Sequence, residues 1–143
     1  MSSHREQVLV ALLSALETLS GPTVRRNEPL PEKLPAGGLV MLRDGELGEP
    51  EILLSPLSYI WRHRAIVEAV VSGGTAASRD GALDSLLTAI GDAIAGTPTL
   101  GGLVDWIEIG PASFETLAIE GAAPLKGATI PTTLHYATSS PLS

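Results

Sequence analysis

Alternation of apolar and polar positions predicts one long β-strand over residues 56–74, and the rest of the chain is organised around it. Every second residue is apolar or aromatic on one face, apart from a single histidine, whereas the charged residues fall on the other. The apolar face carries Tyr59, Trp61, His63, Ala65, Val67, Ala69 and Val71. At about 3.3 Å per residue the run reaches roughly 45–50 Å, which is longer than a usual strand. We therefore expect the strand either to bend at a bulge or to extend beyond its own domain.

Helical spacing of apolar residues predicts two amphipathic helices, at residues 4–19 and 79–95. Ser3 followed by Glu6 is a capping-box pattern at the start of the first helix. Gly21 with Pro22 ends that helix, and a Gly-Thr-Pro sequence ends the second. The stripes that the two helices would bury are Val8, Leu12, Ala15, Leu16 and Leu19 in the first, and Leu83, Leu86, Leu87, Ile90, Ala93 and Ile94 in the second.

The remaining segments read as short strands. Further strands are predicted at 38–43, 103–109, 114–120 and 127–138, with a short extended segment at 23–26. Asp44-Gly45 is a strong hairpin-turn signal, after which residues 51–54 return as a short strand. Pro131 suggests an edge or a bulge near the start of the last strand.

This order of elements predicts an α+β fold, with two helices packed on one face of a mixed, mostly antiparallel sheet and a projecting β-hairpin. The chain has 143 residues, which suggests one domain over residues 1–138, followed by a frayed tail over residues 139–143.

Charge and composition narrow the function classes. Nine basic and sixteen acidic residues give a net charge of −7, which disfavours a nucleic-acid binder whose affinity rests on neutralising phosphates. The chain contains no cysteine, so disulfides and thiolate chemistry are excluded. No apolar run is long enough to span a membrane, so no membrane partner is expected.

Two histidines are the strongest candidates for chemistry. His63 and His135 lie in predicted strands and could be neighbours across the sheet, but two histidines make an incomplete zinc site. We expect both to be partly buried strand residues with polar partners. The sequence contains no HExxH motif, GxSxG elbow or P-loop. It therefore predicts no catalytic residue, no cofactor and no metal, so the protein is not expected to be an enzyme.

Charged side chains suggest interaction surfaces instead. The segment around the predicted hairpin turn is acidic and is expected to project as a docking element; its residues are Asp44, Glu46, Glu49 and Glu51. Arg62 and Arg64 share one face of the long strand, where they contact either an acidic partner, passing DNA or solvent, with an Arg64–Glu68 ion pair as the favoured arrangement. Trp61 and Trp106 are expected to be core residues or subunit-interface anchors.

The order of these features resembles a known family. The helix is followed by VRRNEPLPEKLPAGGLVMLRDGE and by the aromatic-rich YIWRHRAIVEAVV; later come ALDSLLTAIGDAIAGTPTLGGLVDWIEIG and GAAPLKGATIPTTLHYAT. Over residues 5–138 this pattern is similar to the tail terminator, or tail completion, proteins of long-tailed phages. Thr97 stands where an acidic residue is common in that family's turn.

The resemblance implies a structural virion protein without catalytic activity. Six copies would form a ring on the end of the tail tube, stop its polymerisation and provide the surface for head joining. The implied partners are the tail-tube protein and the head–tail connector or stopper protein, and DNA would pass through the ring without specific binding. The implied location is the neck end of the virion tail, after assembly in the bacterial cytoplasm. A composition rich in alanine and leucine and poor in lysine suggests a prophage or a gene-transfer agent.

Two other classes remain open from the sequence. One is a head–tail connector or tail-tube protein of similar size. The other is a small ligand-binding domain or an enzyme that uses His63 and His135.

Overall fold

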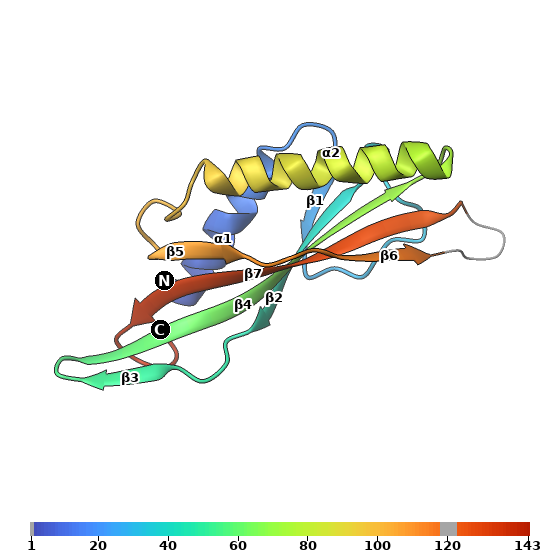
Figure 1. The fold of residues 1–143 in the computed structure, drawn as a ribbon. Helices are drawn as coiled ribbons and strands as arrows, with labels where there is room; N and C mark the ends of the chain where they lie inside the picture. The colour runs from blue at the N-terminus through green and yellow to red at the C-terminus, as the bar shows by residue number, and fades with distance from the viewer. Residues whose placement is uncertain (1, 118–122) are drawn as a thin grey trace.

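A computed structural model describes residues 2–117 and 123–143, which form two helices and a seven-stranded sheet. In chain order the elements are α1 (His4–Glu17), β1 (Thr23–Arg26), β2 (Leu39–Glu46), β3 (Glu51–Leu54), β4 (Leu57–Ser72), α2 (Ala76–Ala95), β5 (Trp106–Ile109), β6 (Ser113–Leu117) and β7 (Leu125–Thr138). Both helices lie on the same face of the sheet (Figure 1), which confirms the predicted α+β fold.

Two long antiparallel strands, β4 and β7, form the centre of the sheet and pair from Tyr59↔Thr138 to Ser72↔Leu125. On the far side of β4, β2 and β3 pair with successive parts of the strand. On the far side of β7, β6 and β5 do the same. β1 joins β2 in parallel, so the sheet is mixed but mostly antiparallel. The long strand β4 thus pairs with two neighbours on one side, β3 along its first residues and β2 along its later ones.

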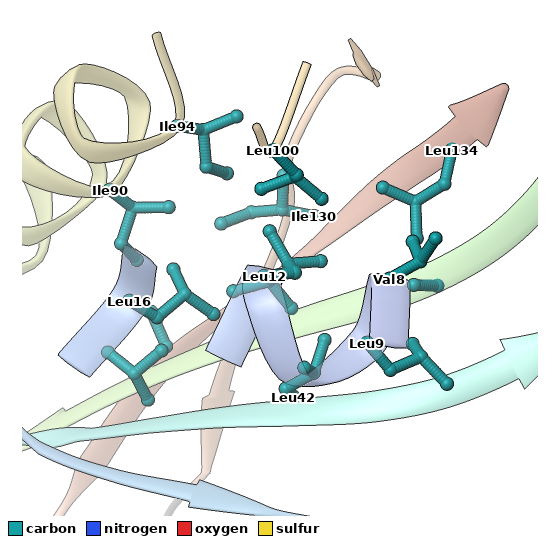
Figure 2. Packing of buried hydrophobic residues seen from close by; sticks show 14 of the residues in the cluster. Val8, Leu9, Leu12, Leu16, Leu42, Ile90, Ile94, Leu100, Ile130 and Leu134 are labelled. Carbon is teal, nitrogen blue, oxygen red and sulfur yellow. The ribbon is translucent and has the colours of Figure 1, made fainter. Parts of the chain in front are cut away.

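The core lies between the helices and the sheet (Figure 2). Val8, Leu12 and Leu16 of α1 are fully buried. From α2, Ile90 and Ile94 point into the same layer, and the sheet contributes Leu42, Ile130 and Leu134. Burying each such side chain stabilises the fold by about 1.5–3 kcal/mol. The alternation along the long strand predicted this buried face, because β4 buries Trp61, His63, Ala65, Val67, Ala69 and Val71.

The predicted hairpin turn at Asp44-Gly45 is wrong. Strand β2 continues through both residues, and its register against β4 shifts between Arg43 and Glu46, which marks a bulge. Gly45 has a φ of 70°, a backbone conformation that both a hairpin turn and a glycine bulge require. The Asp-Gly signal therefore located a positive φ correctly but could not distinguish between these two uses of it.

Pro131 lies in a central strand, which corrects the expectation of an edge or a bulge. Its carbonyl oxygen accepts a hydrogen bond from the Gly110 N–H at 2.8 Å. Because the N and O atoms of one strand residue point to the same neighbour, the missing N–H of Pro131 faces the break between β5 and β6. The proline therefore falls at a position where no ladder bond has to be donated.

The boundaries of most elements differ from the predicted ones by a few residues, and three of them have a clear physical reason or limit. Helix α2 begins at Ala76 because the Thr75 hydroxyl caps it, accepting a hydrogen bond from the Ser78 N–H at 3.1 Å. Strand β5 begins at Trp106, since the Val104 N–H bonds back to the Thr99 carbonyl in a turn. Strand β6 ends at Leu117, and the rest of the strand predicted to residue 120 lies outside the described residues.

Candidate interaction surface

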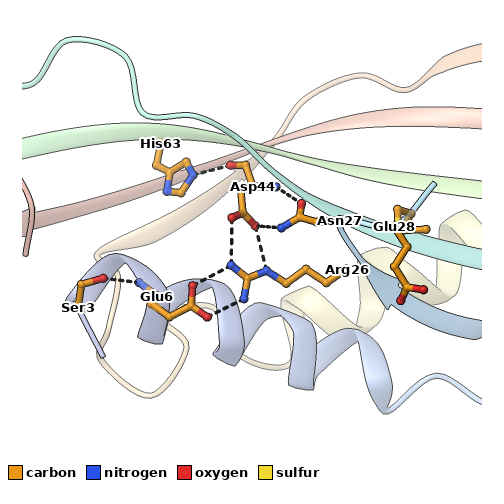
Figure 3. A network of polar contacts seen from close by, with 8 residues as sticks. Ser3, Glu6, Arg26, Asn27, Glu28, Asp44 and His63 are labelled. Atoms are coloured by element: carbon orange, nitrogen blue, oxygen red, sulfur yellow. Dashed lines mark hydrogen bonds and ion pairs between the residues drawn. The ribbon is translucent and has the colours of Figure 1, made fainter. Parts of the chain in front are cut away.

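A polar network joins helix α1 to the bulge of β2 (Figure 3). The Arg26 guanidinium donates two hydrogen bonds to the Glu6 carboxylate at 2.7 and 2.8 Å, and two to the Asp44 carboxylate at 2.9 and 3.1 Å. Asn27 donates to Asp44 at 2.9 Å and accepts from its backbone N–H at 3.1 Å. Asp44 therefore has partners within the chain, and its role as a docking residue stays a prediction.

The charges in this network stabilise one another. Hydrogen bonds from Arg26 hold the pKa of Glu6 below its ordinary value. Burial raises the pKa of Asp44, but hydrogen bonds from Arg26 and Asn27 outweigh it, so that the pKa lies below the ordinary value. The predicted capping box is only half formed, because the Glu6 N–H donates to the Ser3 hydroxyl at 3.1 Å while the Glu6 carboxylate contacts Arg26.

Replacing Arg26 by methionine is expected to lower the free energy of unfolding by about 2 kcal/mol, because several hydrogen bonds to charged groups are lost. Arg25→Met is a matched control on the same strand. Its ion pair with Glu28 is exposed and 3.7 Å long, so we expect a change of less than about 0.5 kcal/mol. Equilibrium urea unfolding measures both variants. Equal effects would show that the network does not fasten α1 to the sheet.

His63 and His135 do not form a common site. In the β4–β7 register His63 lies opposite Leu134, whereas His135 lies opposite Arg62. The two rings therefore point to opposite faces of the sheet, because neighbouring residues of a strand alternate. His63 is 2% exposed beneath the helices, and His135 stacks on Trp106 with ring centroids 4.5 Å apart. The predicted possibility of a shared histidine pair is wrong.

Arg62 and Arg64 are exposed on the sheet face opposite the helices. Glu46 and Glu49 border the same hollow as both arginines, and Glu108 borders a second one with them. The favoured Arg64–Glu68 ion pair is wrong, since Glu68 instead pairs with Arg43 across the β2–β4 ladder. The arginine side chains thus lie in a patch that carries charges of both signs, two basic and three acidic.

The two tryptophans have opposite environments. Trp61 is buried, and its indole N–H donates to the Thr138 hydroxyl at 2.9 Å. This placement makes Trp61 a core residue and corrects its assignment to an interaction surface. Trp106 is half exposed at the edge strand β5, on the same face as Arg62 and His135. An interface on this side of the sheet would therefore contact Trp106 and not Trp61.

The element that projects is the β3–β4 hairpin, whose turn is Ser55-Pro56 and not Asp44-Gly45. In Figure 1 it reaches past both helices at one end of the sheet. Glu49 and Glu51 are exposed at its base, but its tip is apolar. The exposed tip residues are Ile52, Leu53, Leu54 and Leu57.

Sequence reasoning missed this apolar tip. The available signal was the run Ile52-Leu53-Leu54, which is too short for a helix and, being apolar on both strand faces, too apolar for an edge strand with one face in water. Such a run at a sheet edge is either an aggregation hazard or a contact surface.

In the described part of the chain, the His, Asp and Glu side chains nowhere gather in a group of 3 or more that would hold a metal ion. Neither of the described helices is long and apolar enough to cross a membrane.

No protein-family model matches the chain, and no curated protein matches it in sequence.

Proposed function

We propose that this chain is a structural subunit of a phage-like particle, a tail terminator that forms a ring on the end of the tail tube and offers the surface for head joining. The observation that carries the proposal is the β3–β4 hairpin, which projects from a two-helix sheet with an exposed apolar tip. The sequence resemblance over residues 5–138 gives the same assignment. Apolar surface on a projecting element is typical of subunits that are completed by assembly.

A head–tail connector or a tail-tube protein of similar size is the second candidate. The edge strands of the sheet favour a connector or tube protein as much as a tail terminator, because β3 and β5 each have one partner strand among the described residues. A tube protein polymerises without limit, whereas a terminator assembles into a single ring. The enzyme alternative that used both histidines loses its basis, because those rings lie on opposite faces.

Removing the chain from the bacterium that produces the particle tests the function. Electron micrographs should then show tails of uncontrolled length and heads without tails. Complementation with the intact chain should restore normal particles. Tails of normal length, joined to heads, would contradict the terminator function, and long tubes assembled from the purified chain alone would favour a tail-tube protein.

The exposed acids near the hairpin are expected to take part in joining. Replacing Glu46 and Glu49 together by lysine should lower the yield of joined particles by about tenfold, because rim charges set the encounter rate of docking surfaces. Glu32→Lys, an exposed reversal in the proline-rich loop, is the control. Joined particles at normal yield from the double variant would show that these acids do not dock.

Arg62 and Arg64 are not expected to bind DNA tightly. Each phosphate that a ring neutralised would add affinity and slow the passage of DNA. At about 50 mM salt, the assembled protein should bind duplex DNA with a dissociation constant weaker than about 10⁻⁴ M. Replacing both arginines by alanine should leave that value unchanged. Tight binding that disappears in the double variant would make this patch a DNA contact.

A further inference from the structure

The β3–β4 hairpin carries a continuous apolar stripe on its helix-facing side. Register pairs Ile52 with Tyr59 and Leu54 with Leu57, so these four side chains lie on the face that also carries Trp61. Trp61 is buried, yet Ile52 is 52%, Leu54 82% and Leu57 49% exposed. The stripe therefore continues the core face of the sheet beyond the part that the helices cover.

A second apolar surface lies on the same face at the opposite edge of the sheet. Leu87 and Ile90 of α2 form a groove with Ile109 and Ala112 of the edge, and Ile130 lies at its base. Ile109 is 44% exposed. Farther along the edge, Phe114 is 61% exposed and lies opposite buried Ala128, so it faces the same side.

The two surfaces cannot meet within one copy. The hairpin strand β3 flanks β4 on the side away from β7, and β5 and β6 flank β7 on the side away from β4. The backbone groups at these two edges of the sheet are also able to pair with another strand. Within the described residues β3 pairs with β4 alone, and β5 and β6 pair with β7 alone. Each edge thus presents backbone N–H and C=O groups to which a further strand can add.

Apolar area, rather than charge, is what the two surfaces can offer each other. Exposed Glu51 precedes Ile52 on the hairpin, and Glu49 lies at its base. At the groove edge the Lys126 ammonium lies 5.7 Å from the centre of the Phe114 ring and 2.6 Å from the Asp80 carboxylate, so its charge already has a partner within the chain. A second copy thus supplies the apolar area that each surface lacks.

We propose that the β3–β4 hairpin of one copy docks its apolar stripe into the groove between α2 and the β5–β6 edge of a second copy. This is a head-to-tail contact between different surfaces, so every added copy leaves one hairpin and one groove free. Such contacts close into a ring when the rotation per copy divides a full turn. The inference rests on the proposed ring function and names the residues that would hold the ring together.

Cross-linking tests the contact directly, because the chain contains no cysteine. The double variant Leu54→Cys with Ile109→Cys, treated with a short bismaleimide, should give a ladder of covalent oligomers. A mixture of the two single variants should give only heterodimers, and each single variant alone should stay monomeric. Dimers from Leu54→Cys alone would show a hairpin-to-hairpin contact and overturn the proposal.

Charge insertion supplies the second test, by sedimentation of the full chain up to a concentration of about 1 mM, which covers weak specific contacts. Leu54→Asp should be monomeric at a concentration where the unchanged chain is assembled, and so should Phe114→Asp. A mixture of the two variants should form dimers only, since one intact hairpin meets one intact groove. Val10→Asp is the control, because Val10 is 46% exposed on α1 and valine and aspartate have similar helix propensities.

The outcomes separate the contact from the function. Unchanged association of Leu54→Asp, or an intact chain that neither associates nor cross-links at about 1 mM, overturns the contact. Far-ultraviolet circular dichroism of each variant shows that it is folded. If the intact chain associates and the charged variants do not, while particles lacking the chain have normal tails, the proposed contact is supported and the terminator function is contradicted.

Discussion

Replacing Gly45 by alanine is expected to destabilise the fold by about 4 kcal/mol, which is near the upper limit for a single substitution. Gly45 lies in the β2 bulge with a φ of 70°. A Cβ atom there would lie 1.8 Å from the Arg64 carbonyl oxygen and 2.9 Å from its carbon. Backbone atoms of the central strand cannot move aside as a flexible side chain can, so the alanine has to open the β2–β4 ladder.

Gly48→Ala isolates the steric part of this effect. Gly48 has a φ of 69°, nearly the same as Gly45, but a Cβ atom there would meet nothing within 4 Å. Its substitution should therefore cost only the left-handed backbone penalty of about 1–2 kcal/mol. Equilibrium urea unfolding at low protein concentration, where self-association does not contribute, measures both variants. Equal losses would contradict the close approach of β2 and β4.

The layers of this fold could be predicted because local periodicity and tertiary burial agree. The alternation through Ala65, Val67 and Ala69 is also the buried face of β4, and the stripe of α1 packs on it. The ion-pair partner of a charged residue was harder to predict from the sequence. Glu68 could reach Arg64 along its own strand, but the Arg43 side chain lies across the ladder and pairs with it instead.

The candidate surface was predicted less well, for a related reason. Charged residues are obvious in a sequence, and the acidic segment drew attention to Asp44, whose partner Arg26 comes from another strand. Exposed apolar residues are not obvious, because the sequence does not show where the helices stop covering a sheet. Trp61 and Leu57 share one strand and one face, yet only Trp61 lies under the helices.

The second large effect is expected at His63, which lies between the helices and the sheet with both ring nitrogens engaged. Its Nε2 is 2.6 Å from the Asp44 carbonyl oxygen, and its Nδ1 is 2.9 Å from the Tyr136 hydroxyl oxygen. A carbonyl oxygen only accepts, so Nε2 carries the proton and Nδ1 accepts from the tyrosine. The neutral ring therefore satisfies both partners, and burial accordingly lowers the pKa of His63.

His63→Ala is expected to lower the free energy of unfolding by about 3 kcal/mol, since it leaves a cavity and removes the partner of the buried Tyr136 hydroxyl and of the partly buried Asp44 carbonyl. His135→Ala is the matched control on the neighbouring strand. His135 is half-buried on the open face, where it contacts Glu108 at 3.0 Å and stacks on Trp106, so we expect a loss of about 1 kcal/mol. Similar losses in both variants would contradict the buried position of His63.

The stability of the protein should also depend on pH through this residue. Because the pKa of His63 is lower in the folded than in the unfolded chain, the unfolded chain binds a proton there that the folded chain rejects. The free energy of unfolding is therefore highest above about pH 6.5 and falls towards pH 5, with a slope of at most about 1.4 kcal/mol per pH unit.

His63→Gln should remove this slope between about pH 5 and 6.5, because glutamine has no proton to gain there. His135→Gln should retain it. The lowered pKa values of Glu6 and Asp44 act below their ordinary values of 4.5 and 3.8, so they fall outside this window. Urea midpoints measured across the window give the slope of each variant. A slope that persists in His63→Gln would assign the acid sensitivity to another group and remove His63 as its origin.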